Sequence, residues 1–330
     1  MPDALRRGRY DARLMTTLAT PRSEPAALLA LFAGALAIGS SGIFVRLSET
    51  GPTATAFWRG AFALPFLALW VVLERRRRAA AGQANASVRD PLFLWAGVFF
   101  TGDLALWHWS LLLTSIAAST LEANSAPLLV TVFAWLLWGE RPRLGFVLSL
   151  SLAFAGMLLI LAPKLGGGGH GLLGDALGLG TACFYAAYIM VVARLRARHD
   201  TGIVMFASTL VFTVLLLPIA LTQKFLPSTA HGWWLLVGCA LSAQVVGQSL
   251  IAYALAHLPA TFSAVGLYVQ VLAAAGYAWL ILDERLAPVQ LLGGAVVLLA
   301  IAFARTARRA PAAGLSAGVS VQPVEGQRPD

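Results

Sequence analysis

An aspartate in the middle of a long apolar stretch is the residue of this sequence that is best placed to do chemistry. Asp103 lies about twelve residues into the stretch 91–113. If that stretch crosses a bilayer, an ionised side chain at this depth costs about 2.5–3.5 kcal/mol on insertion scales, and we place no Lys or Arg of another stretch at its level. Its carboxyl group could exchange a proton or bind an ammonium group of a substrate. Alternatively, it is neutral and hydrogen-bonds a neighbour for packing. Trp107 shares its helical face because it follows four residues later.

Amide and aromatic side chains form a second set of candidates. Gln244 and Gln248 are four residues apart in an apolar stretch, so both amides point the same way. An unsatisfied amide in hydrocarbon is costly, so these two residues either bridge helices or line a substrate pathway. The side chains that could line the pathway beside them are Tyr185, Tyr188, Tyr268 and Gln270. Amides and aromatics with a single acid suit an amphipathic metabolite better than a bare ion.

A third set of side chains is predicted near the outer ends of the apolar stretches. Arg59 and Glu122 lie at similar depths and could meet, and Arg46 and His108 fall in the same outer third. Such a cluster could gate the external side, although a structural ion pair would use the same residues. His108 also lies between two tryptophans, which is typical of the aromatic belt at a membrane interface.

The elements that must position these residues are transmembrane helices. Hydrophobic residues make up 58% of the chain and charged residues 12%, with a mean hydropathy of +0.76. A bilayer core about 30 Å thick needs roughly 20 apolar residues per helix. The fold class we predict is an all-α integral membrane protein with ten transmembrane helices, at about residues 28–46, 54–73, 91–113, 117–138, 143–163, 172–194, 203–222, 233–256, 260–282 and 288–305. Period-2 alternation is absent, which argues against a porin-type barrel.

The second half of the chain repeats the first at an offset of 144 residues. Ala134-Trp135-Leu136 followed by Glu140-Arg141 recurs as Ala278-Trp279-Leu280 followed by Glu284-Arg285. Five helices per copy is an odd number, so the second copy is inverted, as in many secondary transporters. We predict a cytoplasmic basic tail, a first five-helix repeat, a Gly-rich linker, a second five-helix repeat and a disordered cytoplasmic tail, at residues 1–27, 28–163, 164–171, 172–305 and 306–330.

The net charge of +9 indicates orientation rather than nucleic-acid binding. Of the 24 Lys and Arg residues, all but five fall on the side of the predicted bundle that carries the N-terminus. The five exceptions are Arg46, Arg59, Lys164, Lys224 and Arg285. The positive-inside rule therefore places both termini in the cytoplasm, in a multi-pass protein of the cell inner (plasma) membrane.

Several short segments resemble a known family. Gly-Glu-Arg-Pro at 139–142 follows the fourth predicted helix and Asp-Glu-Arg at 283–285 follows the ninth. Further matches are Trp58-Arg59 after Gly51-Pro52, Ala126-Pro127, and the run from Gly102 to Trp109. With the duplication, the chain resembles the EamA-type transporters of the drug/metabolite transporter superfamily. That resemblance implies a ten-helix transporter of small metabolites, amino acids or drugs. One position departs from the family pattern: the resemblance implies a helix break in the second copy at the position that matches Pro127, but that position is Val271.

The predicted function is secondary transport of a small organic solute, amino-acid-like or amphipathic, by alternating access. We expect an exporter coupled to protons or to exchange, since no Walker motif is present to hydrolyse ATP. No cofactor and no metal are expected, because the five histidines show no metal-ligand spacing. The expected partners are the solute, the lipid bilayer and protons as a coupling ion, with a monomer or homodimer as the functional unit. A membrane-embedded lipid-modifying enzyme and a non-transporting sensor are the alternatives.

Overall fold

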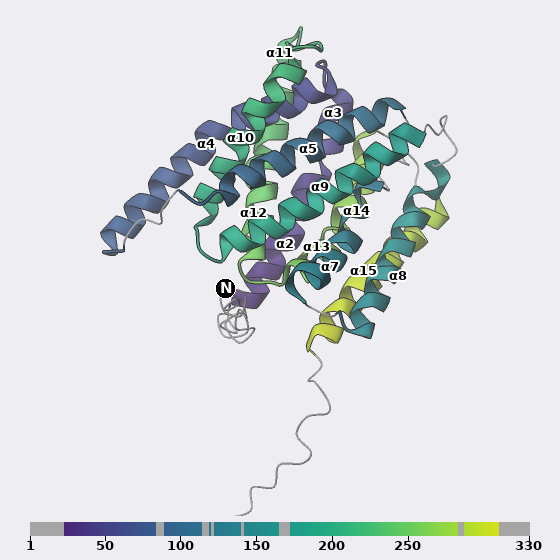
Figure 1. Ribbon diagram of the computed structural model, residues 1–330. Coiled ribbons are helices and arrows are strands. Elements are labelled where there is room, and N and C mark those ends of the chain that lie inside the picture. Colours follow the sequence, from purple (N-terminus) through teal and green to yellow (C-terminus); the bar gives the residue numbers. More distant parts are fainter. Residues whose placement is uncertain are drawn as a thin grey trace, which may run out of the picture.

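The computed structural model describes residues 23–83, 89–113, 119, 122–139, 142–164, 172–282 and 287–309. In this part of the chain every regular element is a helix, and the helices form one bundle (Figure 1). Most of the two predicted tails, the Gly-rich linker from residue 165 on, and the pairs Glu140-Arg141 and Glu284-Arg285 lie outside the described residues.

The first half of the chain contributes six of the described α-helices. They are α2 (Ser23–Gly39), α3 (Ser41–Leu47), α4 (Pro52–Ala80), α5 (Leu92–Leu113), α7 (Ala126–Trp138) and α8 (Leu144–Leu161), followed by the short η1 (Ala162–Lys164). The local sequence explains where several of these helices begin or end. Pro52 and Pro127 lie in the first turns of α4 and α7, where a missing N–H removes no helical bond. Gly139 ends α7 in the left-handed conformation, at φ 69°.

The second half contains α9 (Leu172–Arg196), α10 (Thr201–Ala220), α11 (Ala230–Cys239), the π-helix η2 (Ala240–Gln248), α12 (Ser249–Leu255), α13 (Ala260–Gly266), α14 (Val269–Leu282) and α15 (Pro288–Arg309). Thr229 caps α11, because its side chain accepts a hydrogen bond of 3.0 Å from the Gly232 N–H. In the described part of the chain, seven helical stretches are long and apolar enough to cross a bilayer. The other three predicted spans correspond to the helices α5, α7 and α15.

Four predicted spans are less regular than the sequence suggested. In the fourth, a turn at Asn124 and Ser125 precedes α7. The first is interrupted at Ser40, between α2 and α3, and the eighth contains the π-helix η2 between α11 and α12. The ninth is broken at Leu267 and Tyr268, although Val271 stands where the first copy has a proline. Backbone bonds across this break span three residues, such as Tyr268 N–H to the Val265 carbonyl at 3.1 Å. The chain therefore tightens and turns there without proline.

Helix packing follows the 144-residue offset. α4 packs on α10 and α8 packs on α15, and each of these pairs joins helices at equivalent positions of the two halves. α5 packs on α9; in the same way η2 and α12, which are equivalent to α5, pack on α2, which is equivalent to α9. α7 also packs on α9, and its equivalent α14 packs on α2. Figure 1 shows α8 and α15 side by side, and shows that α2 begins and α15 ends on the same side of the bundle.

Glycines permit the closest of these contacts. A Cβ added to Gly156 would lie 2.8 Å from the Gly293 carbonyl oxygen, and one added to Gly293 would lie 2.6 Å from the Gly156 carbonyl oxygen. Gly34 of α2 approaches the backbone of Gly247 in the same way. Small residues thus allow backbones to approach, as expected of helices packed within a membrane.

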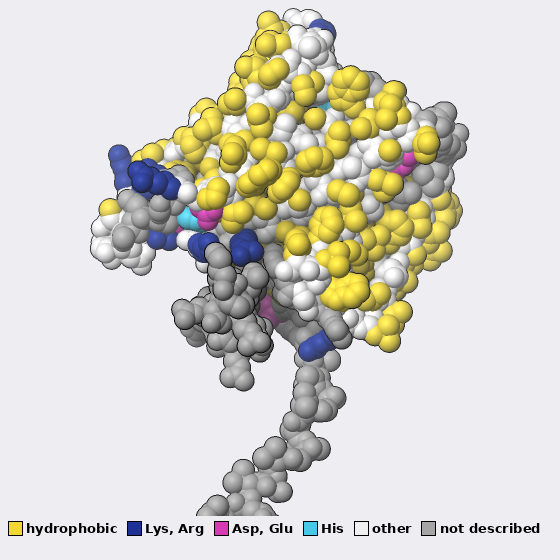
Figure 2. Space-filling model, viewed as in Figure 1, with side chains coloured by type: hydrophobic (Ala, Val, Ile, Leu, Met, Phe, Trp, Pro, Cys, Tyr) yellow, Lys and Arg dark blue, Asp and Glu magenta, His cyan; other side chains and the backbone are white. Residues whose placement is uncertain are grey.

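The surface of the bundle is apolar. Large hydrophobic side chains such as Leu137, Trp234 and Leu299 are more than half exposed. Figure 2 shows hydrophobic side chains over the visible face, with Lys and Arg gathered at the far end of α4 and on the side where α2 begins. An exterior of this kind suits a lipid environment better than water.

Candidate functional site

Five elements meet around a buried set of polar and aromatic side chains, which we call the central cluster. Its members come from α4 and α5 of the first half and from α9, α10 and η2 of the second half. They are Arg59, Phe100, Asp103, Tyr185, Tyr188, Thr209, Gln244 and Gln248. The central cluster unites most of the predicted pathway residues with one residue, Arg59, that was predicted to lie nearer the outer surface.

A hydrogen-bonded chain runs through the central cluster. Arg59 Nε donates to Gln244 Oε1 at 3.1 Å, and Gln244 Nε2 donates to Thr209 Oγ1 at 2.9 Å. All three side chains are buried. The Arg59 guanidinium also lies over the ring of Phe100, 5.6 Å from its centre, a cation–π arrangement. The chain fixes the amide of Gln244, so its oxygen faces α4 and its nitrogen faces α10.

Asp103 is less isolated than its sequence position suggested. Its carboxylate is attracted electrostatically by Arg59 and also interacts with Tyr185, so the expectation that no cation lies at its level is corrected. Its side chain is half-buried. Both Asp103 and Arg59 are described, and no ion pair within 4.0 Å joins them. The two charges therefore lie within electrostatic range of one another without closing a salt bridge.

Aromatic rings form the apolar wall of the central cluster. Phe100 stacks on Tyr188 at 4.6 Å between ring centres, and Tyr188 stacks on Tyr185 at 6.1 Å. Phe212 packs edge-on against Phe100 at 5.1 Å. The side chain of Tyr185 also interacts with Gln248. A charged group and an apolar wall thus lie side by side within the bundle.

Gln244 and Gln248 belong to the π-helix η2, which sequence spacing did not reveal. Both are buried, with 0% and 3% exposure. π-helical segments are rare and frequently mark functional sites. η2 lies against the interrupted first span, where Ser40 Oγ donates to Ser242 Oγ at 3.1 Å.

Tyr268 and Gln270 lie at the break of the ninth predicted span, in a second polar group. Gln270 Nε2 donates to Asn124 Oδ1 at 3.0 Å, and Asn124 is the residue of the first copy that corresponds to Tyr268. Asn124 lies in the turn that precedes α7, so this bond joins the turn of the fourth predicted span to the break of the ninth. Tyr268 is 1% exposed, and its hydroxyl has no hydrogen-bond partner among the described residues.

The residues predicted as an outer gate are distributed over several places. Arg59 joins the central cluster, and the buried His108 lies within the electrostatic influence of Arg59. Glu122 instead contacts α9, where it lies against Gly178 and interacts with Asp175. Arg46 is exposed near the end of α3. Trp107 is partly buried beside His108, with ring centres 5.1 Å apart.

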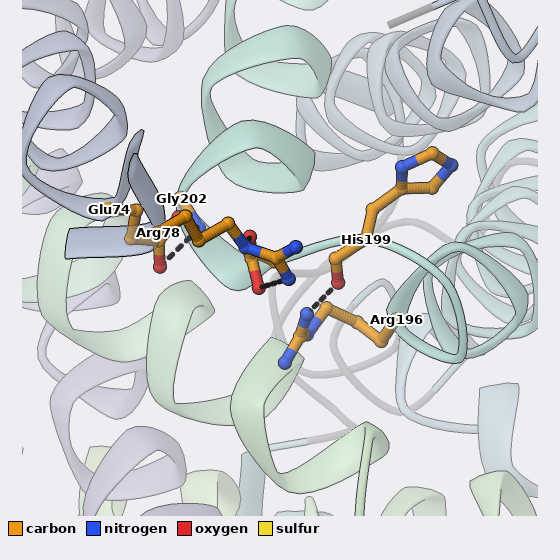
Figure 3. Close-up of polar contacts among 6 residues, drawn as sticks. Glu74, Arg78, Arg196, His199 and Gly202 are labelled. Carbon is orange, nitrogen blue, oxygen red and sulfur yellow. Dashed lines mark hydrogen bonds and ion pairs between the residues drawn. The ribbon is translucent and has the colours of Figure 1, made fainter. Parts of the chain in front are cut away.

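Polar contacts hold α4 and α10 together at the end of the bundle where α9 ends. Arg78 donates to Asp200 Oδ1 at 2.7 Å, and Glu74 Oε2 accepts the Gly202 N–H at 3.1 Å. Figure 3 shows these contacts beside a bond from Arg196 to the carbonyl of His199, whose ring points away from Arg196. The His199 ring nitrogen Nε2 lies 3.5 Å from Asp90. These are contacts between residues far apart in sequence, which a single sequence does not reveal.

At the opposite end of α4, the segment 223–229 covers the turn between α3 and α4. Trp58 Nε1 donates to the Phe225 carbonyl at 2.8 Å, and Gln223 Nε2 donates to Thr53 Oγ1 at 3.1 Å. Glu49 accepts hydrogen bonds from the side chain of Thr229 and from backbone N–H groups, which lowers the pKa of this carboxyl. The central cluster thus lies between two sets of contacts that both link α4 to the second half.

Comparison with known proteins places this architecture in a family. The model of the EamA-like transporter family matches the chain twice, over residues 25–162 and 172–306. The chain belongs to the EamA-like transporter family. It is 27% identical over 282 residues to the pseudopaline exporter CntI of Pseudomonas aeruginosa, in each of two strains, covering 84% of this chain and 95% of that protein.

A solved crystal structure has the same fold. It superposes with a TM-score of 0.71 at 18% sequence identity, over 87% of this chain and 99% of the other. The family and the apolar helices show that the protein is a multi-pass membrane transporter and not an enzyme.

Proposed function

We propose that this EamA-family member is a secondary transporter that exports a small amphipathic organic solute across the inner membrane by alternating access. The observation that carries the proposal is the composition of the central cluster, because both halves of the chain contribute to it. Arg59 and Asp103 come from the first half, and Tyr188 and Gln244 from the second. A site between two repeats is where such transporters bind their substrates.

The proposed architecture has ten transmembrane helices in two inverted repeats, residues 28–163 and 172–305. The twofold match to the family model and the helix pairs related by the 144-residue offset support this division. One copy suffices to form the pathway, so a monomer would function, and a homodimer is compatible with the same pathway. The clustering of Lys and Arg on the side where α2 begins supports cytoplasmic termini.

Export as the direction rests on the relatives, which are named as exporters. Energy would come from a proton gradient or from exchange, with Asp103 as the group that carries the proton. A carboxyl group that lies near a cation without forming an ion pair can change its protonation as its surroundings change between conformations. A ligand, here the proton, shifts an equilibrium only through its different affinity for the two states.

The test is flux of a solute through the purified protein. A solute screen by thermal shift would identify ligands, and proteoliposomes loaded with one of them would then be assayed for its movement with and without a pH gradient. Saturable flux that is lost in the Gln244→Leu variant supports the proposal. Ligand binding without flux in sealed vesicles would identify a sensor instead of a transporter.

A further inference from the structure

Arg59 has more hydrogen-bonding capacity than the protein uses. A guanidinium group presents five N–H donors in a planar fork, and Nε is the donor for which the structure shows a partner, Gln244. Nη2 is buried and has no hydrogen-bond partner among the described residues, and Arg59 is only 8% exposed. A buried charged group with an unpaired donor is unfavourable, so an acceptor from outside the chain would stabilise it.

The acids nearest to Arg59 do not fill that role. Asp103 attracts Arg59 but forms no ion pair with it within 4.0 Å. Glu122, which could have met Arg59 from its depth in the sequence, lies against α9 beside Asp175 and Gly178. The free edge of the guanidinium therefore remains unmatched by the acids of the described chain.

We propose that Arg59 recognises the substrate and that it does so by binding a carboxylate of the solute. This inference rests on the proposed transport function and names its substrate class. The planar fork of arginine matches the two oxygens of a carboxylate. A singly charged group also fits the local charge, since one cation and one nearby acid would bind a dianionic phosphate poorly.

The side chains around Arg59 indicate the chemical character of the solute beyond its carboxylate. Phe100 lies under the guanidinium, and the rings of Tyr188 and Tyr185 continue the wall from Phe100. These rings suit an apolar or aromatic body attached to the carboxylate. Asp103 lies within electrostatic range of Arg59 and Tyr185 and can receive a proton or a cationic group of the solute.

The first experiment compares acids with their amides on the wild-type protein. Purified protein in detergent is titrated with 3-phenylpropionate and with the twenty proteinogenic amino acids, and thermal unfolding reports binding. The corresponding amide of each ligand found is then titrated in the same way. We expect at least one carboxylate to raise the Tm. We expect its amide to bind at least about 10-fold more weakly. No stabilisation by any carboxylate of the panel, or equal binding of acid and amide, would overturn the proposal.

The second experiment changes the protein. Arg59→Gln should weaken binding of the carboxylate about 10- to 100-fold. Arg59→Lys keeps the charge but lacks the planar fork, so its affinity for the carboxylate should lie between those of Arg59→Gln and wild type. Arg76→Gln, an exposed arginine further along the same helix, is the matched control and should bind as wild type does. Binding by Arg59→Gln within twofold of wild type would contradict the proposal. If that variant does not fold, the comparison of acid with amide on wild type decides alone.

The two proposals fail in different ways. A solute that binds through its carboxylate but never crosses sealed vesicles would refute transport and leave the role of Arg59 intact. A solute that crosses equally well as acid and as amide would refute the role of Arg59 and leave transport intact.

Discussion

Replacing Gln244 by leucine tests the hydrogen-bonded chain of the central cluster. Leucine has nearly the size of glutamine, so the substitution removes hydrogen bonds with little change in packing. The bond of 3.1 Å from Arg59 and the bond of 2.9 Å to Thr209 are both lost. A hydrogen bond to a charged group contributes about 1.5–3 kcal/mol and a neutral one about 1 kcal/mol. Because Arg59 and Thr209 are both buried, water replaces these partners poorly.

The expected loss for Gln244→Leu is therefore about 2–4 kcal/mol of unfolding free energy. Thr209→Val removes only the neutral bond and should cost about 1 kcal/mol. Gln244→Glu offers Arg59 a carboxylate of the protein itself, so it should keep the stability of wild type while it competes with the carboxylate of a solute. Reversible denaturation in mixed micelles measures the three variants against wild type. A loss below about 0.5 kcal/mol for Gln244→Leu would show that the hydrogen bonds from Arg59 through Gln244 to Thr209 do not stabilise the bundle.

Three further changes test the inverted repeats, the close contact of α8 with α15 and the role of Asp103. Cysteines introduced at Arg143 and Ala287 should be labelled from opposite sides of the membrane in intact cells, and equal protection of the two would contradict the inverted repeats. Gly293→Ala should cost about 1–3 kcal/mol by forcing α8 and α15 apart, as measured by the same denaturation, whereas Gly276→Ala, where an added Cβ meets nothing within 4 Å, should be neutral or stabilising. Asp103→Asn should abolish accumulation driven by a pH gradient in proteoliposomes but retain solute exchange, and normal accumulation would make Asp103 a packing residue.

The sequence predicted the helices well because a membrane span needs a long apolar run, and such runs are visible without any tertiary information. It predicted the irregularities poorly. Pro127 in the first copy and Val271 in the second suggested different behaviour, yet the helix is interrupted in both copies at nearly equivalent positions, Asn124-Ser125 and Leu267-Tyr268. The break near Tyr268 lies in contact with the first half of the chain, where Gln270 bonds to Asn124, and contacts of this kind have no local signal in the sequence.

The sequence grouped some residues of the central cluster but not all of them. Spacing of four residues predicted that Gln244 and Gln248 point the same way, and both are buried in the structure. Depth in a span did not reveal that Arg59 reaches Gln244, which lies 185 residues away in sequence. Long arginine side chains extend far from their backbone position, so an estimate of depth from the sequence misplaced the charge and separated Arg59 from Asp103.

Reactivity of Cys239 tests alternating access at the central cluster most directly. The chain has two cysteines, so Cys183→Ser leaves Cys239 as the single thiol. Cys239 is buried, with 1% exposure, and lies within the electrostatic influence of Arg59. A small membrane-impermeant thiol reagent is applied to vesicles from either side in turn, and modification is followed by mass spectrometry. Alternating access predicts modification from both sides, slowed by a transported solute. Modification from one side only, or from neither, in a variant that still transports would contradict it.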